Sequence, residues 1–109
     1  MARLDQVNAL LSQELALLLP QYIAVRGGLV TITGVRCTAD LRWANVYVSI
    51  LPEKFAGTVL GKLRRQSGQI TKQLQKRVKI RRIPKFNWLN DATESKAAEI
   101  DEVFKHLHD

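Results

Sequence analysis

The sequence is poor in the residues and segments that mark several protein classes. It has one cysteine, Cys37, which excludes an intramolecular disulfide and a cysteine cluster for a structural metal. No apolar run approaches the ~18 residues of a membrane span, and the acidic, amphipathic start of the chain is unlike a signal peptide. These absences favour a cytoplasmic protein with no membrane partner and no targeting segment.

Proline is also scarce and charge is moderate, and together these predict a folded chain. Three prolines and 25% charged residues argue against disorder, while 46% hydrophobic residues are enough for a packed core. A chain of 109 residues buries about two-thirds of its unfolded surface when it folds. Because no repeat or linker-like stretch interrupts it, the sequence predicts a single domain over residues 1–109.

Acidic residues are missing from one stretch, residues 62–85, which we call the basic segment. It contains ten lysines and arginines and no acid, whereas the other seven bases of the chain are outnumbered by its ten acids. The net charge of +7 therefore arises in this segment. Such a concentration favours a polyanionic partner, because each neutralised phosphate releases condensed counterions. The alternative is a solvated face that serves solubility alone.

The first half of the chain predicts a helix and then a β-hairpin. Before Pro20, leucine and valine recur at three- and four-residue spacing, which is typical of an amphipathic helix. The apolar stripe consists of Leu4, Val7, Leu11, Leu15 and Leu18. Residues 29–39 predict a strand whose apolar positions change phase at Gly34, so we expect a β-bulge there. The bulge would place four residues on one face: Val30, Ile32, Val35 and Cys37.

A second strand and a helix follow in the middle of the chain. After a turn at residues 40–42, residues 43–50 alternate apolar and polar side chains and predict a strand with one face in the core. Residues 54–78 predict a helix in two pieces, because the tripeptide Gln66-Ser67-Gly68 combines a flexible glycine with a serine that can cap the second piece. The alternative is one straight helix that tolerates glycine at a cost of about 1 kcal/mol. The residues predicted to face inward are Val59, Leu60, Leu63, Ile70, Leu74 and Val78. The bases predicted on the opposite stripe are Lys72, Lys76 and Lys79.

A third strand and a last helix complete the predicted order. Residues 84–89 predict a strand with Phe86 and Trp88 on one side. Asp91 or Thr93 is expected to cap the last helix. Its apolar face would consist of Ile100, Val103, Phe104 and Leu107.

Several local strings resemble a known family. They are Asp40-Leu41 followed by Ala44, the string Val46-Tyr47-Val48-Ser49, the pair Ser67-Gly68, and Arg82-Ile83-Pro84 with Phe86, Trp88 and Asp91. Their order and spacing over nearly the whole chain resemble the bacterial ribosome-binding factor A family, whose fold is a type II KH-like domain. The resemblance implies an α+β fold of the order α-β-β-α-α-β-α. It implies a three-stranded sheet packed by helices on one face, with a helix break at Ser67-Gly68.

The resemblance also implies a function and partners. Members of the family are small-subunit assembly factors that bind free 30S particles, contact 16S ribosomal RNA, assist maturation of its 5′ region and often matter most in the cold. Assembly GTPases are further candidate partners, and nothing in the sequence calls for a dimer, so we expect a monomer. The chain has no Gly-x-x-Gly loop, and it departs from the family's Ala-x-Gly kink because Gln66 stands in place of the alanine. We also expect no contact from the disordered C-terminal extension that some members carry.

The basic segment supplies a physical mechanism for RNA binding. Arginine forks engage two phosphate oxygens, lysines act as point charges, and backbone N–H groups at a helix start near Gly68 would add donors. Recognition would then rest mainly on RNA shape and backbone. The expected RNA-binding residues are Arg64, Arg65, Ser67, Gly68, Lys72, Lys76, Arg77, Lys79, Arg81, Arg82 and Lys85. Trp43, Tyr47 and Trp88 would stack on unpaired bases if exposed, and the alternative places them in the core.

No catalytic or cofactor site emerges from the sequence. His106 and His108 would point to different sides of a helix, as would Asp101 and Glu102, and Cys37 lies in an apolar strand. A Gly-rich phosphate loop and a His-Glu-x-x-His motif are both missing. We therefore predict a non-enzymatic RNA-binding module with no cofactor and no metal. Two alternatives stay open: a nucleoid-type or other nucleic-acid binder without ribosome specificity, and a membrane-surface or protein-interaction module that uses the basic helices.

Overall fold

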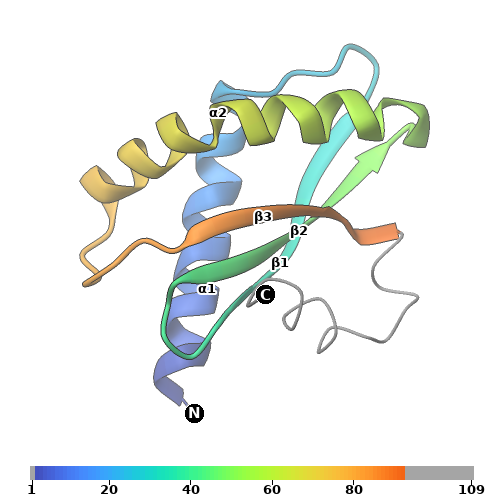
Figure 1. Cartoon of the computed structure of the whole chain (residues 1–109). Coiled ribbons are helices and arrows are strands. Elements are labelled where there is room, and N and C mark those ends of the chain that lie inside the picture. Colours follow the sequence, from blue (N-terminus) through green and yellow to red (C-terminus); the bar gives the residue numbers. More distant parts are fainter. Residues whose placement is uncertain (1, 93–109) are drawn as a thin grey trace.

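The chain folds into a mixed α+β domain (Figure 1). The structure is a computed structural model, and it describes residues 2–92. Its elements are the helix α1 (Ala2–Leu18), the strands β1 (Leu29–Cys37) and β2 (Trp43–Leu51), the helix α2 (Ala56–Arg77) and the strand β3 (Lys85–Asn90). Short 3-10 turns at Leu19–Gln21 and Glu53–Phe55 follow α1 and precede α2. The predicted apolar face of the last helix lies outside the described residues.

The sheet has the order β1-β2-β3, with β1 antiparallel and β3 parallel to β2. The register passes from Ile32 opposite Val48 to Gly34 opposite Tyr47, so Thr33 is the extra residue of a bulge. The predicted bulge is thus confirmed. Because one inserted residue reverses the two-residue alternation, the apolar positions on both sides of it face the core.

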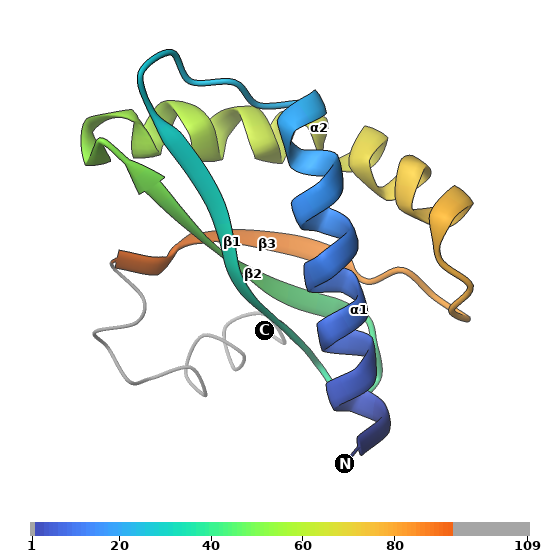
Figure 2. The ribbon, with the colours of Figure 1, turned by 180° about the vertical axis from the view of Figure 1, so that it is seen from behind.

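Both helices pack on one face of the sheet, as predicted. In Figure 1 helix α1 crosses behind the sheet, and Figure 2 shows it in front from the opposite side. The core between helices and sheet is one continuous cluster, and Trp88 at its centre is 0% exposed. Each large apolar side chain buried there contributes about 1.5–3 kcal/mol by leaving water. Its fully buried large apolar residues are Leu11, Leu15, Val46, Val48, Leu63, Ile70, Leu74 and Trp88.

Helix α2 is one continuous helix of 22 residues, so the predicted separation into two helices at Ser67-Gly68 is wrong. Gly68 does not have a positive φ, and the Ser67 hydroxyl accepts a hydrogen bond from the indole N–H of Trp88 (3.2 Å) instead of capping a new helix. Burial of Leu63 and Ile70 on either side outweighs the ~1 kcal/mol that a mid-helix glycine costs. The axis nevertheless bends midway along α2 in both ribbon views, which is the usual effect of a Gly/Ser pair (Figures 1 and 2).

Helical backbone begins directly after β3. Residues 91 and 92 are helical, and the side-chain oxygen of Asn90 accepts a hydrogen bond from the backbone N–H of Ala92 at 3.0 Å. This is the hydrogen bond of a helix N-cap, and Asn90 makes it in place of the predicted Asp91. The other predicted capping residue, Thr93, lies outside the described residues.

Candidate nucleic-acid interface

The turn between β1 and β2 is held by two polar side chains and positions Arg42. The Thr38 hydroxyl donates to a carboxylate oxygen of Asp40 (2.6 Å), and the same oxygen accepts from the backbone N–H of Arg42 (3.0 Å). The backbone of Trp43 is bonded at both its N–H and its carbonyl to Thr38. Leu41 adopts a positive φ of 59° to close the turn. This local network fixes the direction in which Arg42 and Trp43 leave the hairpin.

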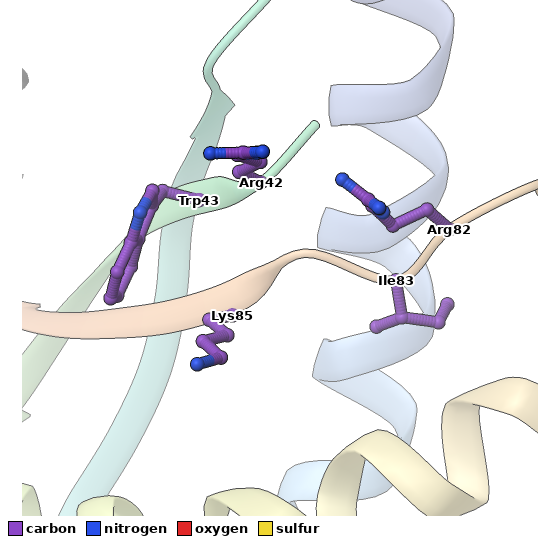
Figure 3. Close-up of a pocket in the computed structure, with 5 residues that line it drawn as sticks. All are labelled: Arg42, Trp43, Arg82, Ile83 and Lys85. Carbon is purple, nitrogen blue, oxygen red and sulfur yellow. The ribbon is translucent and has the colours of Figure 1, made fainter. Parts of the chain in front are cut away.

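Parallel pairing of β2 and β3 brings this turn beside the end of the basic segment. Residue Trp43 lies opposite Lys85, and the backbone N–H of Lys85 donates to the carbonyl of Arg42 at 3.0 Å. The two strand starts and the residues just before them line an open pocket of about 440 Å³, shown in Figure 3. Its lining residues are Arg42, Trp43, Arg82, Ile83 and Lys85. We call it the strand-start pocket.

Within this pocket the aromatic ring already contacts a cation. The ammonium nitrogen of Lys85 lies 5.8 Å from the centroid of the Trp43 ring, which is within the range of a cation–π contact. Trp43 is half-buried, whereas Tyr47 and Trp88 are buried. The alternative that places these aromatic residues in the core is therefore confirmed for Tyr47 and Trp88, which pack inside the domain.

The exposed side of α2 carries part of the predicted basic stripe. Arg65, Lys72 and Lys76 are exposed on this helix, while Ile70 and Leu74 are buried on its other side. The sequence predicted that the stripe includes Lys79, and this is wrong. Helix α2 ends at Arg77, and Val78 has extended backbone angles. The exposed bases Lys79, Arg81 and Arg82 lie instead in the connection between α2 and β3.

Three other predicted site residues make contacts within the protein. The guanidinium of Arg64 donates to the backbone carbonyl of Trp88 (3.0 Å), and Ser67 accepts from the indole of the same residue. Arg77 forms an ion pair with Glu14, which joins the end of α2 to α1. Gly68 lies in the middle of α2, so the expected helix start with free backbone N–H donors at this position is wrong. Arg64 and Ser67 thus join α2 to β3, and Arg77 joins α2 to α1.

The sequence analysis did not name Arg42 as an RNA-binding residue. It treated Trp43 in the same way as Tyr47 and Trp88, as a residue that stacks on bases if exposed and otherwise lies in the core. Arg42 lies outside the basic segment, and about forty residues separate it from Arg82 along the chain. The sequence did place Arg42 and Trp43 at the start of the second predicted strand. If two neighbouring strands are parallel, their starts lie together at the same end of the sheet. Whether the third strand ran parallel to the second was not readable from the sequence.

Metal ligation and the reactivity of the single cysteine bear on other chemistry among the described residues. They contain no group of three or more histidines, cysteines, aspartates and glutamates that is placed to hold a metal ion. Burial raises the pKa of the Cys37 thiol to about 11, which keeps it protonated and weakly nucleophilic at neutral pH. Among these same residues, no helix has the length and apolar character to cross a membrane.

Comparison with known proteins assigns the family. The model of the family described as ribosome-binding factor A matches residues 3–104 of the chain. The chain belongs to the ribosome-binding factor A family. It is 36% identical over 106 residues to ribosome-binding factor A of Prosthecochloris aestuarii, covering 94% of this chain and 87% of that protein. To the protein of the same name from Chlorobaculum tepidum it is 35% identical over 108 residues, with coverages of 96% and 90%.

Solved structures of ribosome-binding factor A share the fold. A crystal structure of the protein from Thermus thermophilus gives a TM-score of 0.73 at 26% identity, over 84% of this chain and 98% of that one. A homology model of the same factor, fitted into the cryo-EM map of a 30S–ribosome-binding factor A complex, gives 0.66 at 30% identity, with coverages of 78% and 92%. The KH-like α+β fold that the resemblance implied is consistent with these structures.

Proposed function

We propose that this protein binds the small ribosomal subunit as a non-catalytic assembly factor. The observation that carries the proposal is the likeness of the chain to a ribosome-binding factor A placed in a 30S complex. The chain then contacts 16S ribosomal RNA on free 30S particles in the cytoplasm and assists processing of the 5′ region. It acts as a monomer, and assembly GTPases are candidate partners in its release.

The RNA contacts are made by the exposed lysines and arginines of α2 and of the connection that follows it. Arg65, Lys72 and Lys76 face solvent on the helix. Lysines placed on one helix side neutralise phosphates without reading bases, and arginine forks engage two phosphate oxygens where the RNA backbone allows it. The proposed contact residues are Arg65, Lys72, Lys76, Lys79, Arg81, Arg82 and Lys85. Arg64 and Arg77 contribute mainly by holding the scaffold, because both are engaged by protein groups.

Sedimentation of cell extract tests ribosome specificity. The protein should comigrate with free small subunits and be missing from translating ribosomes. Depletion at low temperature should lead to 16S RNA with unprocessed 5′ ends, which primer extension detects. Equal competition by duplex DNA and by 30S particles for the purified protein would instead favour a general nucleic-acid binder.

Salt dependence tests the electrostatic mechanism. If about five phosphates are neutralised, the logarithm of the association constant for 16S RNA should fall with the logarithm of salt concentration at a slope of about −4. Lys72→Ala should make this slope shallower by about one unit, because it removes one phosphate contact. Lys54→Ala is the control, since Lys54 is also exposed and lies outside the basic segment, where its ammonium group contacts the Phe55 ring. A slope that does not change with Lys72→Ala would contradict this assignment.

A further inference from the structure

The strand-start pocket combines an aromatic ring, an apolar side chain and three cations at one place. Residues that line it come from two segments that only the parallel pairing of β2 and β3 brings together (Figure 3). We propose that this pocket binds one unpaired nucleotide of single-stranded RNA, with the base on the Trp43 ring and its phosphate held by Arg42, Arg82 and Lys85. This inference rests on the proposed function and names the kind of RNA that this part of the surface takes.

The Trp43 ring is suited to stacking because it is anchored and accessible. Its backbone is hydrogen-bonded to Thr38 on both sides, so the ring stands on a fixed strand end. The ring lines the strand-start pocket, which gives a ligand access to it. The ammonium group of Lys85 lies 5.8 Å from the ring centroid, so a stacked base would replace this contact and leave Lys85 free to bind the phosphate. Trp88, at 0% exposure, has no such face.

The three cations of the pocket lie to one side of the Trp43 ring in Figure 3. Arg42 leaves the hairpin turn, and Arg82 and Lys85 flank the entry to β3, as Figure 3 shows. Three positive side chains that share one pocket repel one another, and a phosphate relieves this repulsion. The carboxylate of Asp40 lies near the backbone of Arg42 but does not line the pocket. A volume of about 440 Å³ falls within the range of about 300–1,000 Å³ that is common for small-ligand sites.

An aromatic ring in such a place distinguishes unpaired from paired RNA. In a duplex both faces of every internal base are covered by neighbouring base pairs, so a protein ring cannot stack on them, and contacts are confined to phosphates, sugars and base edges in the minor groove. An unpaired base offers its own face, and stacking on a protein ring does not require a particular base. The pocket therefore adds affinity for single strands that the exposed lysines and arginines of α2 do not provide.

Intrinsic fluorescence reports this stacking directly on the wild-type protein. Hexauridylate should quench the emission of Trp43, whereas an RNA duplex of twelve base pairs should bind without that quenching. Trp43→Phe should remove the quenching and retain most of the affinity, because phenylalanine still offers a ring. Quenching that persists in Trp43→Phe, or no quenching in the wild type, would overturn the proposal. Uridine monophosphate that binds as tightly as hexauridylate would also overturn it, since the site would then serve a free nucleotide.

Affinity measurements on variants provide the second test. Trp43→Leu should weaken hexauridylate binding about tenfold, equivalent to about 1.4 kcal/mol, and leave duplex binding within about twofold. Arg42→Gln should weaken hexauridylate binding more than Arg26→Gln, which removes an exposed arginine that is outside the basic segment and does not line the pocket. Equal losses from the two arginine variants, or equal losses of hexauridylate and duplex in Trp43→Leu, would refute a nucleotide site. Circular dichroism of each variant checks that the fold is retained.

Failure of this inference and failure of the proposed function give different results. If hexauridylate neither quenches Trp43 nor depends on it, while the wild-type protein still comigrates with free small subunits, the pocket is wrong and the ribosomal function stands. If hexauridylate binds as described and the protein does not comigrate with small subunits, the nucleotide site stands and the ribosomal function is wrong.

Discussion

Ser67→Ala tests whether the bend of α2 is tied to β3 by one hydrogen bond. The Ser67 hydroxyl accepts from the indole N–H of Trp88 at 3.2 Å, and Trp88 is 0% exposed, so alanine leaves a buried N–H without its partner. A buried donor left without a partner costs about 1–3 kcal/mol. Alanine returns about 0.5 kcal/mol through its higher helix propensity. Because the cost of the unpaired indole exceeds the gain in helix propensity, we expect a net loss of about 1 kcal/mol or more.

Urea denaturation followed by circular dichroism measures this loss. For a chain of this size, 1 kcal/mol corresponds to a fall of about 4 °C in the melting temperature, which gives a second readout. Thr58→Ala is the matched control, because Thr58 is exposed on the same helix and its replacement changes only helix propensity. We expect this control to be neutral or slightly stabilising.

A double-mutant cycle separates the hydrogen bond from other effects. Trp88→Phe removes the indole N–H, so in that background Ser67→Ala should no longer destabilise the protein and should show only the gain of about 0.5 kcal/mol in propensity. An identical effect of Ser67→Ala in both backgrounds would refute the reasoning, because the cost would then have nothing to do with Trp88.

Two further predictions concern a substitution at Gly68 and the chemical reactivity of Cys37. Gly68→Ala should stabilise the protein by about 0.5–1 kcal/mol in urea, because a Cβ at this position meets no atom within 4 Å and φ is not positive; a loss of stability would show that the bend requires glycine. Cys37, with a pKa raised to about 11 by burial, should react slowly with iodoacetamide at pH 8 in the folded protein and rapidly in urea, and equal rates would contradict its burial. Since the raised pKa favours the protonated thiol in the folded state, its contribution to stability is complete below pH 9 and declines as the pH rises toward 11.

Local patterns in the sequence were enough to predict most of the elements. The repeat of leucines before Pro20 predicted α1, and the phase change at Gly34 predicted the bulge, because both depend on periodicities of three to four residues or of two. The break at Ser67-Gly68 was a weaker inference. Glycine and serine permit a break, but packing of the flanking apolar residues against the sheet kept α2 continuous, and propensity alone does not contain that packing energy.

The order of the residues alone was sufficient for the periodicities of the domain, its single basic segment and its family resemblance. Which lysine and arginine side chains are available to a ligand depends on the folded chain. Folding turned Arg64 and Arg77 toward protein partners, ended α2 before Lys79 and placed Arg42 and Trp43 beside Lys85. The two kinds of information differ because hydrophobic periodicity is a property of neighbouring residues, whereas a binding pocket depends on strand pairing between segments that are far apart in the chain.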